Sequence, residues 1–405
     1  MDALTTPSNW QRVRLGDIGK PCMCKRVMKH QTTRHGEIPF YKIGTFGNTA
    51  DAFISKKLFL EYKTKYSFPK KGDILISASG TIGRAVIYDG KPAYFQDSNI
   101  VWIDNDETLV KNDFLFYAYS NVKWDTEHTI ILRLYNDNFR NTLIPLPPLN
   151  EQIAIANVLS DVDHYLYSLR ALILKKESVK KALSFELLSQ RKRLKGFNQA
   201  WQRVRLGDIT TSFTKQTGFD YSASIKPTLI KEQLPNYIPF IQNKDFSGHY
   251  INYKTDYFIP NEIAIRFPQI LLNEKCLLIS ISGAIGNVAV FNHSQDAFIG
   301  GAIAVLKFKE KKSLDFVMHF LMSASGQKSL LNIVKASSHK SIILADLRDL
   351  LIPLPPLNEQ IAIANILSDL DHEIISLKNK KRQFENIKKA LNHDLMSAKI
   401  RVLKK

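Results

Sequence analysis

The sequence contains only three cysteines among 405 residues, and they form no recognisable framework. Cys22 and Cys24 make a Cys-Met-Cys without a partner pair downstream, and Cys276 stands alone. Disulfide scaffolds and zinc sites need more cysteines at regular spacings, so both are excluded and a reducing compartment is expected. The N-terminal stretch MDALTTPSNW has no apolar signal segment, and no apolar run approaches the ~18 residues of a membrane helix. The sequence therefore predicts a soluble cytoplasmic protein.

Signatures of common enzymes are also missing. The sequence has no GxxxxGK[ST] phosphate loop, no GxGxxG after a strand, and ten histidines without metal-ligand spacing. Both Pro-Pro-Leu elements lack the aromatic residue of the amino-methyltransferase tetrapeptide. Glu61 and Lys63, with Asp51 upstream, weakly imitate a nuclease metal site, but a charged pair on the surface is the simpler interpretation. We therefore expect the isolated chain to be no enzyme and to hold no metal.

Positive charge is what the sequence has in excess. Lysine and arginine number 56 against 38 aspartates and glutamates, which gives a net charge of +18. Such an excess is typical of proteins that neutralise nucleic-acid phosphates, although basic ribosomal and membrane-surface proteins share it. The hydrophobic content of 44% is enough for sizeable cores, and the length favours two or three domains.

Two stretches of the sequence occur twice. Residues 144–164 read IPLPPLNEQIAIANVLSDVDH, and residues 352–372 repeat them with 19 of 21 positions identical. Residues 10–18 and 201–209 both read WQRVRLGDI. The offset is 208 residues for the first pair and 191 for the second, so the second half carries 17 more residues between its landmarks. A period of this length predicts two duplicated domains and not a solenoid of short repeats.

A long helix is predicted after each proline-rich segment. Proline restricts its own backbone and that of the preceding residue, so no helix can begin upstream of Pro147 and Pro148 or of their repeats. Asn150 and Asn358 are the predicted N-caps. Apolar residues then alternate at spacings of four and three over about 40 residues, which is typical of a coiled-coil seam roughly 60 Å long. We expect the two helices to pair antiparallel, with one globular domain at each end.

The stretches between the landmarks read as a mixture of strands and helices. In the first half, short apolar runs predict strands at 73–79, 85–88 and 99–103, and a helix at 114–120. The corresponding stretches of the second half are 276–282, 288–291, 302–308 and 314–324.

The predicted fold is therefore α+β, mixed α/β, with an internal pseudo-twofold repeat. Two globular domains are separated by a pair of long antiparallel coiled-coil helices. The predicted boundaries place the globular domains at 1–148 and 194–356, and the helices at 149–193 and 357–405.

A serine- and glycine-rich turn in each half carries candidate contact residues. Small hydroxyls and backbone N–H groups can approach a phosphate backbone, and an arginine can bind a guanine edge bidentately. The candidates are Ser77, Ser79, Thr81 and Arg84 in the first half, and Ser280, Ser282 and Asn287 in the second. Their differences suit two domains that read different sequences, although neutral divergence would give the same pattern. A plain turn between two buried strands is the alternative interpretation.

Other polar and basic clusters are further candidates for contact with DNA. The first half contributes Lys25, Arg26, Lys42, Thr45, Gln96, Ser98 and Asn99. The second half contributes Lys215, Gln216, Gln242, Asn243, Lys244, His339, Lys340 and Ser341. Basic runs along the helices more often form a solvated face, and here they also suit the DNA between the two contact sites.

With these features assembled, essentially the whole chain resembles the DNA-specificity subunit of type I restriction–modification systems. The resemblance rests on WxxxxLGDI at the start of each half, the turn ISASGTIG or ISISGAIG within it, and IPLPPLNEQ before a long helix. It implies two target-recognition domains that each read half of a split, asymmetric DNA site, while the helices fix the spacer. It also implies that this chain has no active site and no cofactor. The implied partners are two modification subunits, which bring S-adenosylmethionine and methylate adenine, and two restriction subunits, which use ATP and Mg²⁺.

The near-identical helix starts suit two copies of one methyltransferase. The candidate docking residues are Pro148, Leu149, Asn150, Glu151, Gln152, Asn157 and Asp161, and their repeats Pro356, Leu357, Asn358, Glu359, Gln360, Asn365 and Asp369. The alternative function is a structural or adaptor coiled-coil protein with two DNA-binding heads and no methyltransferase partner. Such a protein would have no reason to repeat this polar surface.

Overall fold

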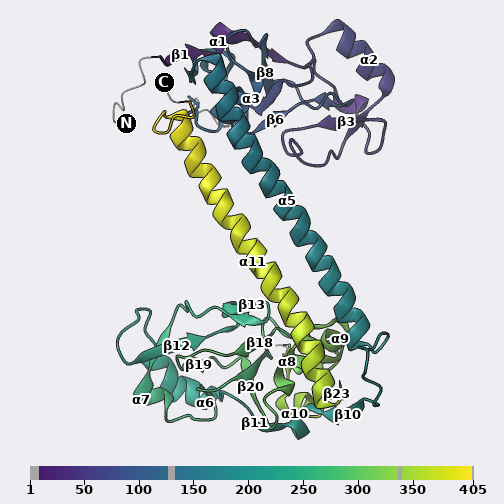
Figure 1. The fold of residues 1–405 in the computed structure, drawn as a ribbon, viewed down its shortest axis with the longest axis vertical. Coiled ribbons are helices and arrows are strands. Elements are labelled where there is room, and N and C mark those ends of the chain that lie inside the picture. The colour runs from purple at the N-terminus through teal and green to yellow at the C-terminus, as the bar shows by residue number, and fades with distance from the viewer. Residues whose placement is uncertain (1–8, 126–132, 336–339, 404–405) are drawn as a thin grey trace. The chain divides into compact units, whose positions relative to one another are not determined.

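The protein forms two compact units in its computed structural model, which describes residues 9–125, 133–335 and 340–403. Unit 1 comprises residues 1–171 and 379–405, and unit 2 comprises residues 172–378. Each unit combines a globular α/β part with a portion of both long helices, α5 Leu149–Leu188 and α11 Leu357–Met396 (Figure 1). The units thus divide the chain within the helices, whereas the sequence-based boundaries at 148 and 356 separate the helices from the globular parts.

The centre of unit 1 is an antiparallel sheet with the strand order β2-β8-β5-β6. Its strands are β2 Gly19–Met23, β8 Ile100–Asn105, β5 Ile74–Ser77 and β6 Ala85–Ile87. Alternate side chains of a strand point to opposite faces. Val101 of β8 therefore joins one hydrophobic cluster, and Trp102 joins the other. β8 is consequently buried on both faces and holds the core of the unit together.

Smaller elements complete unit 1. A second sheet has the order β4-β3-β7, in which β3 pairs antiparallel with β4 and parallel with β7. A separate antiparallel ribbon joins β1 to β9 and so pairs the two repeated landmarks of this half. The bounds are β1 Gln11–Arg14, β3 Ile38–Tyr41, β4 Phe53–Ile54, β7 Tyr94–Phe95, β9 Leu143–Leu146, α1 Leu15–Ile18, α2 Lys56–Lys65, α3 Asn112–Tyr119 and α4 Asn136–Asn141.

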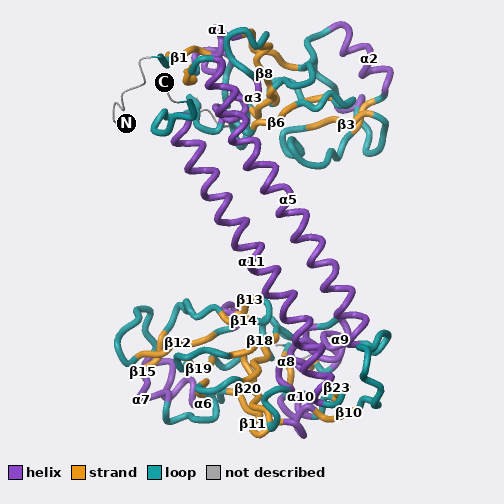
Figure 2. The backbone as a smooth tube through the Cα atoms, viewed as in Figure 1, coloured by secondary structure: helices purple, strands orange, loops and turns teal. Residues whose placement is uncertain are grey.

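Unit 2 repeats this plan with additional elements (Figure 2). Its antiparallel sheet has the order β11-β20-β17-β18, its mixed sheet the order β15-β12-β19-β16, and β10 pairs with β23 as β1 does with β9. The strands are β10 Gln202–Arg205, β11 Thr210–Lys215, β12 Tyr237–Ile241, β13 Phe246–Ser247, β14 Tyr250–Ile251, β15 Phe258–Pro260, β16 Leu271–Leu272, β17 Cys276–Ser280, β18 Val288–Phe291, β19 Ala297–Ile299, β20 Ile303–Phe308, β21 Val334–Lys335, β22 Ser341–Ile342 and β23 Leu351–Leu354. The helices are α6 Gly218–Asp220, α7 Asn261–Ala264, α8 Ser313–Met322, α9 Ala324–Asn332 and α10 Leu344–Arg348.

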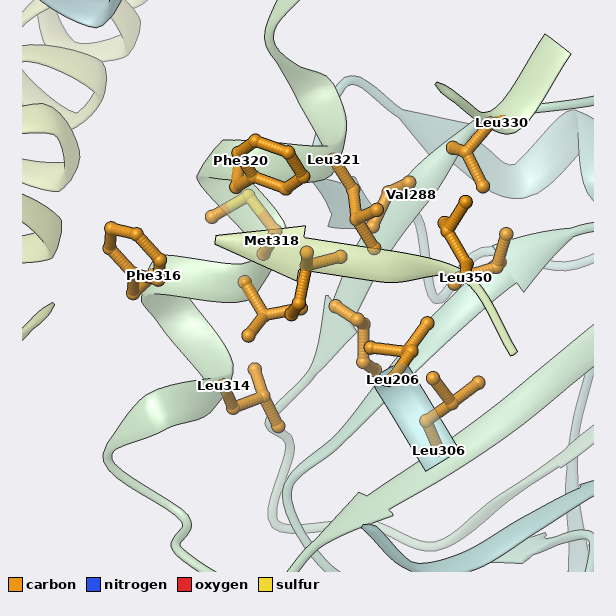
Figure 3. Packing of buried hydrophobic residues seen from close by; sticks show 14 of the residues in the cluster. Leu206, Val288, Leu306, Leu314, Phe316, Met318, Phe320, Leu321, Leu330 and Leu350 are labelled. Atoms are coloured by element: carbon orange, nitrogen blue, oxygen red, sulfur yellow. The ribbon is translucent and has the colours of Figure 1, made fainter. Parts of the chain in front are cut away.

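The larger core cluster of unit 2 packs α8 against its antiparallel sheet. Figure 3 shows Leu314, Phe316 and Phe320 in this cluster, together with residues of the sheet. Ile363 and Leu367, from the first turns of α11, belong to the same cluster, as Ile155 and Leu159 of α5 belong to the core of unit 1. The start of each long helix is thus part of a globular core.

The long helices pair antiparallel within each unit, as predicted. α5 spans Leu149–Leu188 and α11 spans Leu357–Met396, 40 residues each. In unit 1, Asp163 forms an ion pair with Lys388 at 2.6 Å, and the rings of Tyr165 and Phe384 lie 4.6 Å apart. In unit 2, Lys176 pairs with Glu373 at 2.7 Å. The mixed α/β fold, the internal repeat and the antiparallel pairing are therefore confirmed.

The predicted N-caps are wrong by two residues. The helices begin at Leu149 and Leu357, and the carbonyl oxygen of Pro148 accepts a hydrogen bond from the backbone N–H of Gln152 at 3.0 Å. Proline tolerates this position because its fixed φ suits a helix start and its missing N–H would have no partner there. Asn150 therefore lies inside the first turn, where its side-chain oxygen accepts from the N–H of Glu151 at 3.0 Å.

Candidate nucleic-acid interface

Three loops of unit 1 meet where the two sheets end, and we call them loop cluster 1 (residues 42–47, 77–84 and 96–99). The side-chain oxygen of Gln96 accepts a hydrogen bond from the N–H of Ile43 at 3.0 Å. Arg84 donates from Nη1 to the carbonyl oxygen of Phe46 at 3.0 Å. These bonds bring together candidates that are far apart in the sequence, and Thr81 and Arg84 are exposed there.

The two serines of this turn do not face solvent. Ser77 is 2% exposed and donates to the carbonyl of Thr81, and Ser79 donates to the side chain of Asn99 at 2.9 Å. Both hydroxyls therefore hold the loops in place. The expectation that they approach a phosphate is contradicted, because neither is free at the surface.

Gly83 has a steric role in the same turn. Its φ is +82°, and a Cβ at this position would lie 2.1 Å from Nε1 of Trp124. Side chains disfavour this φ and the space is occupied, so the turn requires glycine here.

The remaining candidates of unit 1 are Lys42, Thr45 and Ser98 within loop cluster 1, and Lys25 and Arg26 outside it. Arg26 forms an ion pair with Asp97 at 2.8 Å, and Lys42 pairs with Asp51 at 2.8 Å. Lys25 is exposed, with its ammonium 5.0 Å from the ring centre of Tyr66. The other candidates have structural contacts: Thr45 accepts from the N–H of Lys42, and the carbonyl of Ser98 accepts from Arg133. Exposed ion pairs of this kind are weak, so these cations can exchange partners.

Unit 2 brings its own candidates together in loop cluster 2 (residues 242–244, 280–287, 300–302 and 340–341). The side chain of Asn243 donates to the carbonyl of Ser282 at 2.5 Å, and Ser282 bridges to Ser341. Asn287 and Lys340 line one hollow in this cluster. Ser280 is fully buried, so its predicted contact with a phosphate is contradicted as for Ser77. His339 lies outside the described residues.

Three more candidates of unit 2 are Lys244, which belongs to this cluster, and Lys215 and Gln216, which lie outside its ranges. Lys215 is exposed, and Lys244 forms an ion pair with Asp256. Gln216 is 2% exposed, and neither atom of its amide has a hydrogen-bond partner in the described part of the chain. Its side-chain oxygen would lie 3.4 Å from a Cβ on Gly301, so it sits behind the loop and away from the surface.

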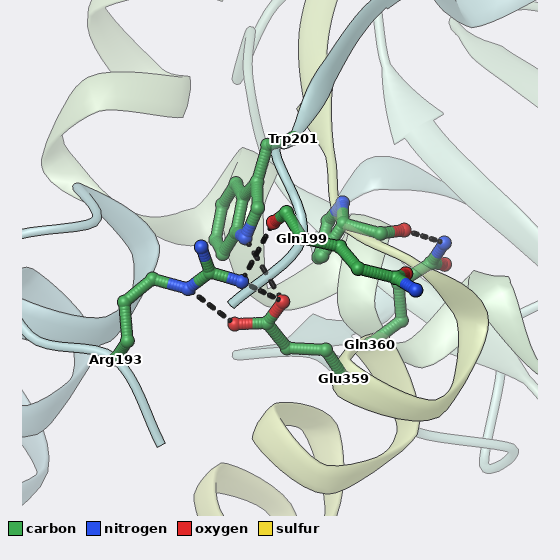
Figure 4. Close-up of polar contacts among 6 residues, drawn as sticks. Arg193, Gln199, Trp201, Glu359 and Gln360 are labelled. Atoms are coloured by element: carbon green, nitrogen blue, oxygen red, sulfur yellow. Dashed lines mark hydrogen bonds and ion pairs between the residues drawn. The ribbon is translucent and has the colours of Figure 1, made fainter. Parts of the chain in front are cut away.

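The repeated glutamate at each helix start forms a buried clamp, which the sequence did not reveal. In unit 2, Glu359 is 1% exposed and accepts from Nε and Nη2 of Arg193 at 2.9 and 2.6 Å, and from Nε1 of Trp201 at 3.1 Å (Figure 4). In unit 1, Glu151 accepts in the same way from Arg401 and from Trp10, the latter at 3.0 Å. The sequence signal that could have revealed this clamp is the offset of 208 residues. It relates Arg193 to Arg401, and it also relates Glu151 to Glu359.

The neighbouring glutamines are also buried. Gln152 donates to the carbonyl oxygens of Pro147 and Leu109 at 2.9 and 3.0 Å, and Gln360 donates to that of Pro355 at 2.7 Å. The expectation that Glu151, Gln152, Glu359 and Gln360 form a docking surface is therefore contradicted, because internal contacts cover them.

A surface face nevertheless repeats along the two helices. Its members are exposed or partly exposed and identical in the two copies, and after an adjacent first pair they follow at spacings of three or four residues. They are Leu149, Asn150, Ile153, Asn157 and Asp161 in unit 1, and Leu357, Asn358, Ile361, Asn365 and Asp369 in unit 2. We call this the repeated helix face. Pro148 and Pro356 lie at its beginning and are exposed and partly exposed, respectively.

Unit 2 contains a cluster with two histidines, His249 and His319. Asp371 pairs with Lys180 and lies 3.3 Å from Nε2 of His249. Nε2 of His319 is 2.9 Å from the hydroxyl of Ser368, and burial lowers the pKa of His319 to about 3. Burial likewise lowers the pKa of His249. A cleft of about 1150 Å³ opens beside these residues, between the long helices, the β13–β14 hairpin and α8.

In residues 9–125, 133–335 and 340–403, no cluster of histidine, cysteine and carboxylate side chains could hold a metal ion. Within the same ranges, no helix is both long and apolar enough to cross a membrane.

Two repeated mixed α/β units with polar loop clusters, joined by long antiparallel helices, define a duplicated recognition protein. The chain belongs to the family of type I restriction modification DNA specificity domains, whose model matches residues 7–180 and 198–386. It is 28% identical over 425 aligned residues to the type I restriction enzyme MjaVIII specificity subunit of Methanocaldococcus jannaschii, with 99% of this chain and 95% of that protein covered.

Two further similarities concern a segment of the chain and the fold. A segment of 148 residues, 36% of this chain, is 62% identical to a putative type I restriction enzyme specificity subunit of Haemophilus influenzae, S.HindORF215P, and covers 38% of that protein. The fold is similar to the crystal structure of the S subunit of the type I restriction-modification system of M. genitalium. That similarity has a TM-score of 0.63 at 17% identity and covers 97% of both chains.

Proposed function

We propose that this chain is the DNA sequence-recognition subunit of a type I restriction–modification complex in the cytoplasm. Each unit reads one half of a bipartite, asymmetric DNA site. The single observation that carries this proposal is that the two units repeat one framework but differ at the exposed loop positions. The turn glycines keep positive φ values in both units, at Gly80, Gly83, Gly283 and Gly286, whereas exposed Arg84 corresponds to exposed Asn287. A shared framework with different contact residues suits two different half-sites.

The helices set the distance between the half-sites and dock the partner subunits. Each helix has 40 residues and contributes to both units. The repeated helix face offers the same exposed residues twice, which suits two copies of one modification subunit, and the restriction subunits join through them. Catalysis lies in those partners, which bring S-adenosylmethionine, ATP and Mg²⁺, and this chain needs no cofactor.

The test is a methylome. The chain is co-expressed with its host's modification subunit in a strain that lacks adenine methylation, and modified adenines are mapped across the genome. We expect a split asymmetric motif. Arg84→Ala weakens selection in the first half-site alone, and Asn287→Ala weakens it in the second alone.

Two results would contradict the proposal. If either substitution changes both half-sites equally, the assignment of one half-site to each unit is wrong. If no methylation appears, DNA binding persists and the modification subunit does not co-purify, the structural or adaptor function replaces the proposed one.

A further inference from the structure

The structure gives a residue-by-residue correspondence between the two loop clusters. Lys42 and Gln242 are each the first residue after an equivalent strand, β3 or β12. The equivalence is fixed by the parallel partner strand: Tyr41 pairs with Phe95 in unit 1, and Ile241 pairs with Ile299 in unit 2. Lys42 and Gln242 therefore occupy the same place in the two units.

The serine–glycine turn gives a second correspondence. The N–H of Ser77 donates to the carbonyl of Arg84 at 3.0 Å, and the N–H of Ser280 donates to that of Asn287 at 2.8 Å. The preceding glycines, Gly83 and Gly286, have φ values of +82° and +88°. Because the backbone is the same, the side chains of residues 84 and 287 leave the turn from the same point.

The type of side chain changes in the same way at both pairs of corresponding positions. Unit 1 presents a cation, Lys42 or Arg84, where unit 2 presents an amide, Gln242 or Asn287. Lysine and arginine match the two acceptors of guanine, O6 and N7, whereas asparagine and glutamine match the donor and acceptor of adenine, N6 and N7. Arg84 uses Nη1 to hold Phe46, and its side chain makes no other hydrogen bond within the described ranges, which leaves donors for a base.

A third position changes how closely a ligand can approach. Gln96 caps the N–H of Ile43 in unit 1, but its counterpart in unit 2 is Gly300. Without that side chain, a hollow of about 300 Å³ remains, lined by residues 242–244 and 300–303. The side-chain oxygen of Asn243 is buried and has no hydrogen-bond partner in the described part of the chain. Unit 2 thus offers polar groups beside Gln242 at the position where unit 1 carries the side chain of Gln96.

We infer that Lys42 and Arg84 select guanine in the first half-site, and that Gln242 and Asn287 select adenine at the corresponding positions of the second. This inference rests on the proposed function and adds the bases to it. The adenines that Gln242 and Asn287 select are scored separately from the adenine that the modification subunit methylates.

The test uses the whole complex with its modification subunit and reads genome-wide adenine methylation. The variants are Arg84→Asn, Lys42→Gln and the reciprocal Asn287→Arg. Lys71→Gln is the matched control, because Lys71 is an exposed lysine outside loop cluster 1. We expect Arg84→Asn to reduce selection of one guanine in the first half-site by about 5- to 150-fold and to leave the second unchanged. Asn287→Arg shifts one position of the second half-site from adenine to guanine, and Lys71→Gln leaves the motif unchanged.

The outcomes separate the inference from the proposed function. A split motif in which Arg84→Asn affects no guanine of the first half-site overturns the base assignment and leaves the function intact. If the unmodified chain yields no split motif, the proposed function itself is overturned. A variant that abolishes methylation is tested by selecting binders from randomised duplexes with the purified complex. A relaxed guanine position then supports the inference, and an unchanged one overturns it.

Discussion

Removing the carboxylate of Glu359 is expected to destabilise unit 2. Glu359→Ala deletes the acceptor of three hydrogen bonds and leaves Arg193 and the indole N–H of Trp201 without their partner. Breaking a buried ion pair on one side costs roughly 3–5 kcal/mol. Since the side chain of Arg193 is 27% exposed and regains some water, we expect a loss of about 3 kcal/mol in the free energy of unfolding.

The structure supplies matched controls for this experiment. Asn358 is exposed at the same helix start, so Asn358→Ala should change the stability by less than about 0.5 kcal/mol. Glu151→Ala removes the equivalent carboxylate of unit 1 and should destabilise that unit instead. Arg193→Ala combined with Glu359→Ala should cost clearly less than the sum of the two single changes, because the pair is lost only once.

The assay is hydrogen exchange in increasing urea, resolved by peptide, because the two units need not unfold together. Glu359→Ala should lower the urea midpoint for peptides of β10, β23 and α8 and spare the β8 peptides of unit 1. An equal loss in both units, or a loss no greater than that of Asn358→Ala, would refute the structural role of the clamp.

Two further predictions concern pH and spacing. The pKa of His319 is about 3 in the folded state and about 6.5 when unfolded, so unit 2 loses stability as the pH falls from 6.5 towards 3, because only the unfolded chain binds the proton. At pH 5 the loss is about 2 kcal/mol in the free energy of unfolding. His319→Gln should therefore reduce the acid sensitivity of urea unfolding, whereas the exposed control His293→Gln should not. If both variants are as acid-sensitive as the unmodified chain, this prediction is wrong. Deleting one heptad from each of α5 and α11 should shorten the spacer in the methylome while preserving both half-site sequences, and an unchanged spacer would exclude the helices as the ruler.

The repetitive and locally determined features were predictable from the sequence. The strands at 74–77 and 276–280 lie within predicted apolar runs, and the long helices follow the proline-rich segments. Periodicity and turn glycines report local structure directly, which explains this success.

The burial of polar side chains was not predictable, because it depends on partners distant in the sequence. Ser79 reads as an exposed hydroxyl until Asn99 is seen to cover it, and Glu151 reads as a surface carboxylate until Arg401 closes over it. The helix starts were misplaced for a different reason. Asparagine is a common N-cap residue, but here the carbonyl oxygens of Pro148 and Pro356 already accept the first hydrogen bonds of the helices.

The clamp also changes what the repeated sequence implies about partners. β1 pairs with β9, Trp10 just before β1 reaches Glu151, and Ile155 and Leu159 enter the same core. These positions must match one another inside each unit, so internal packing alone accounts for much of the 19-of-21 identity. Packing does not account for exposed Asn157 or Asp161, whose repeats Asn365 and Asp369 are also exposed. The repeated helix face is therefore the part of the repeat that supports the proposed pair of identical partner subunits, and substitutions there are expected to separate partner binding from folding.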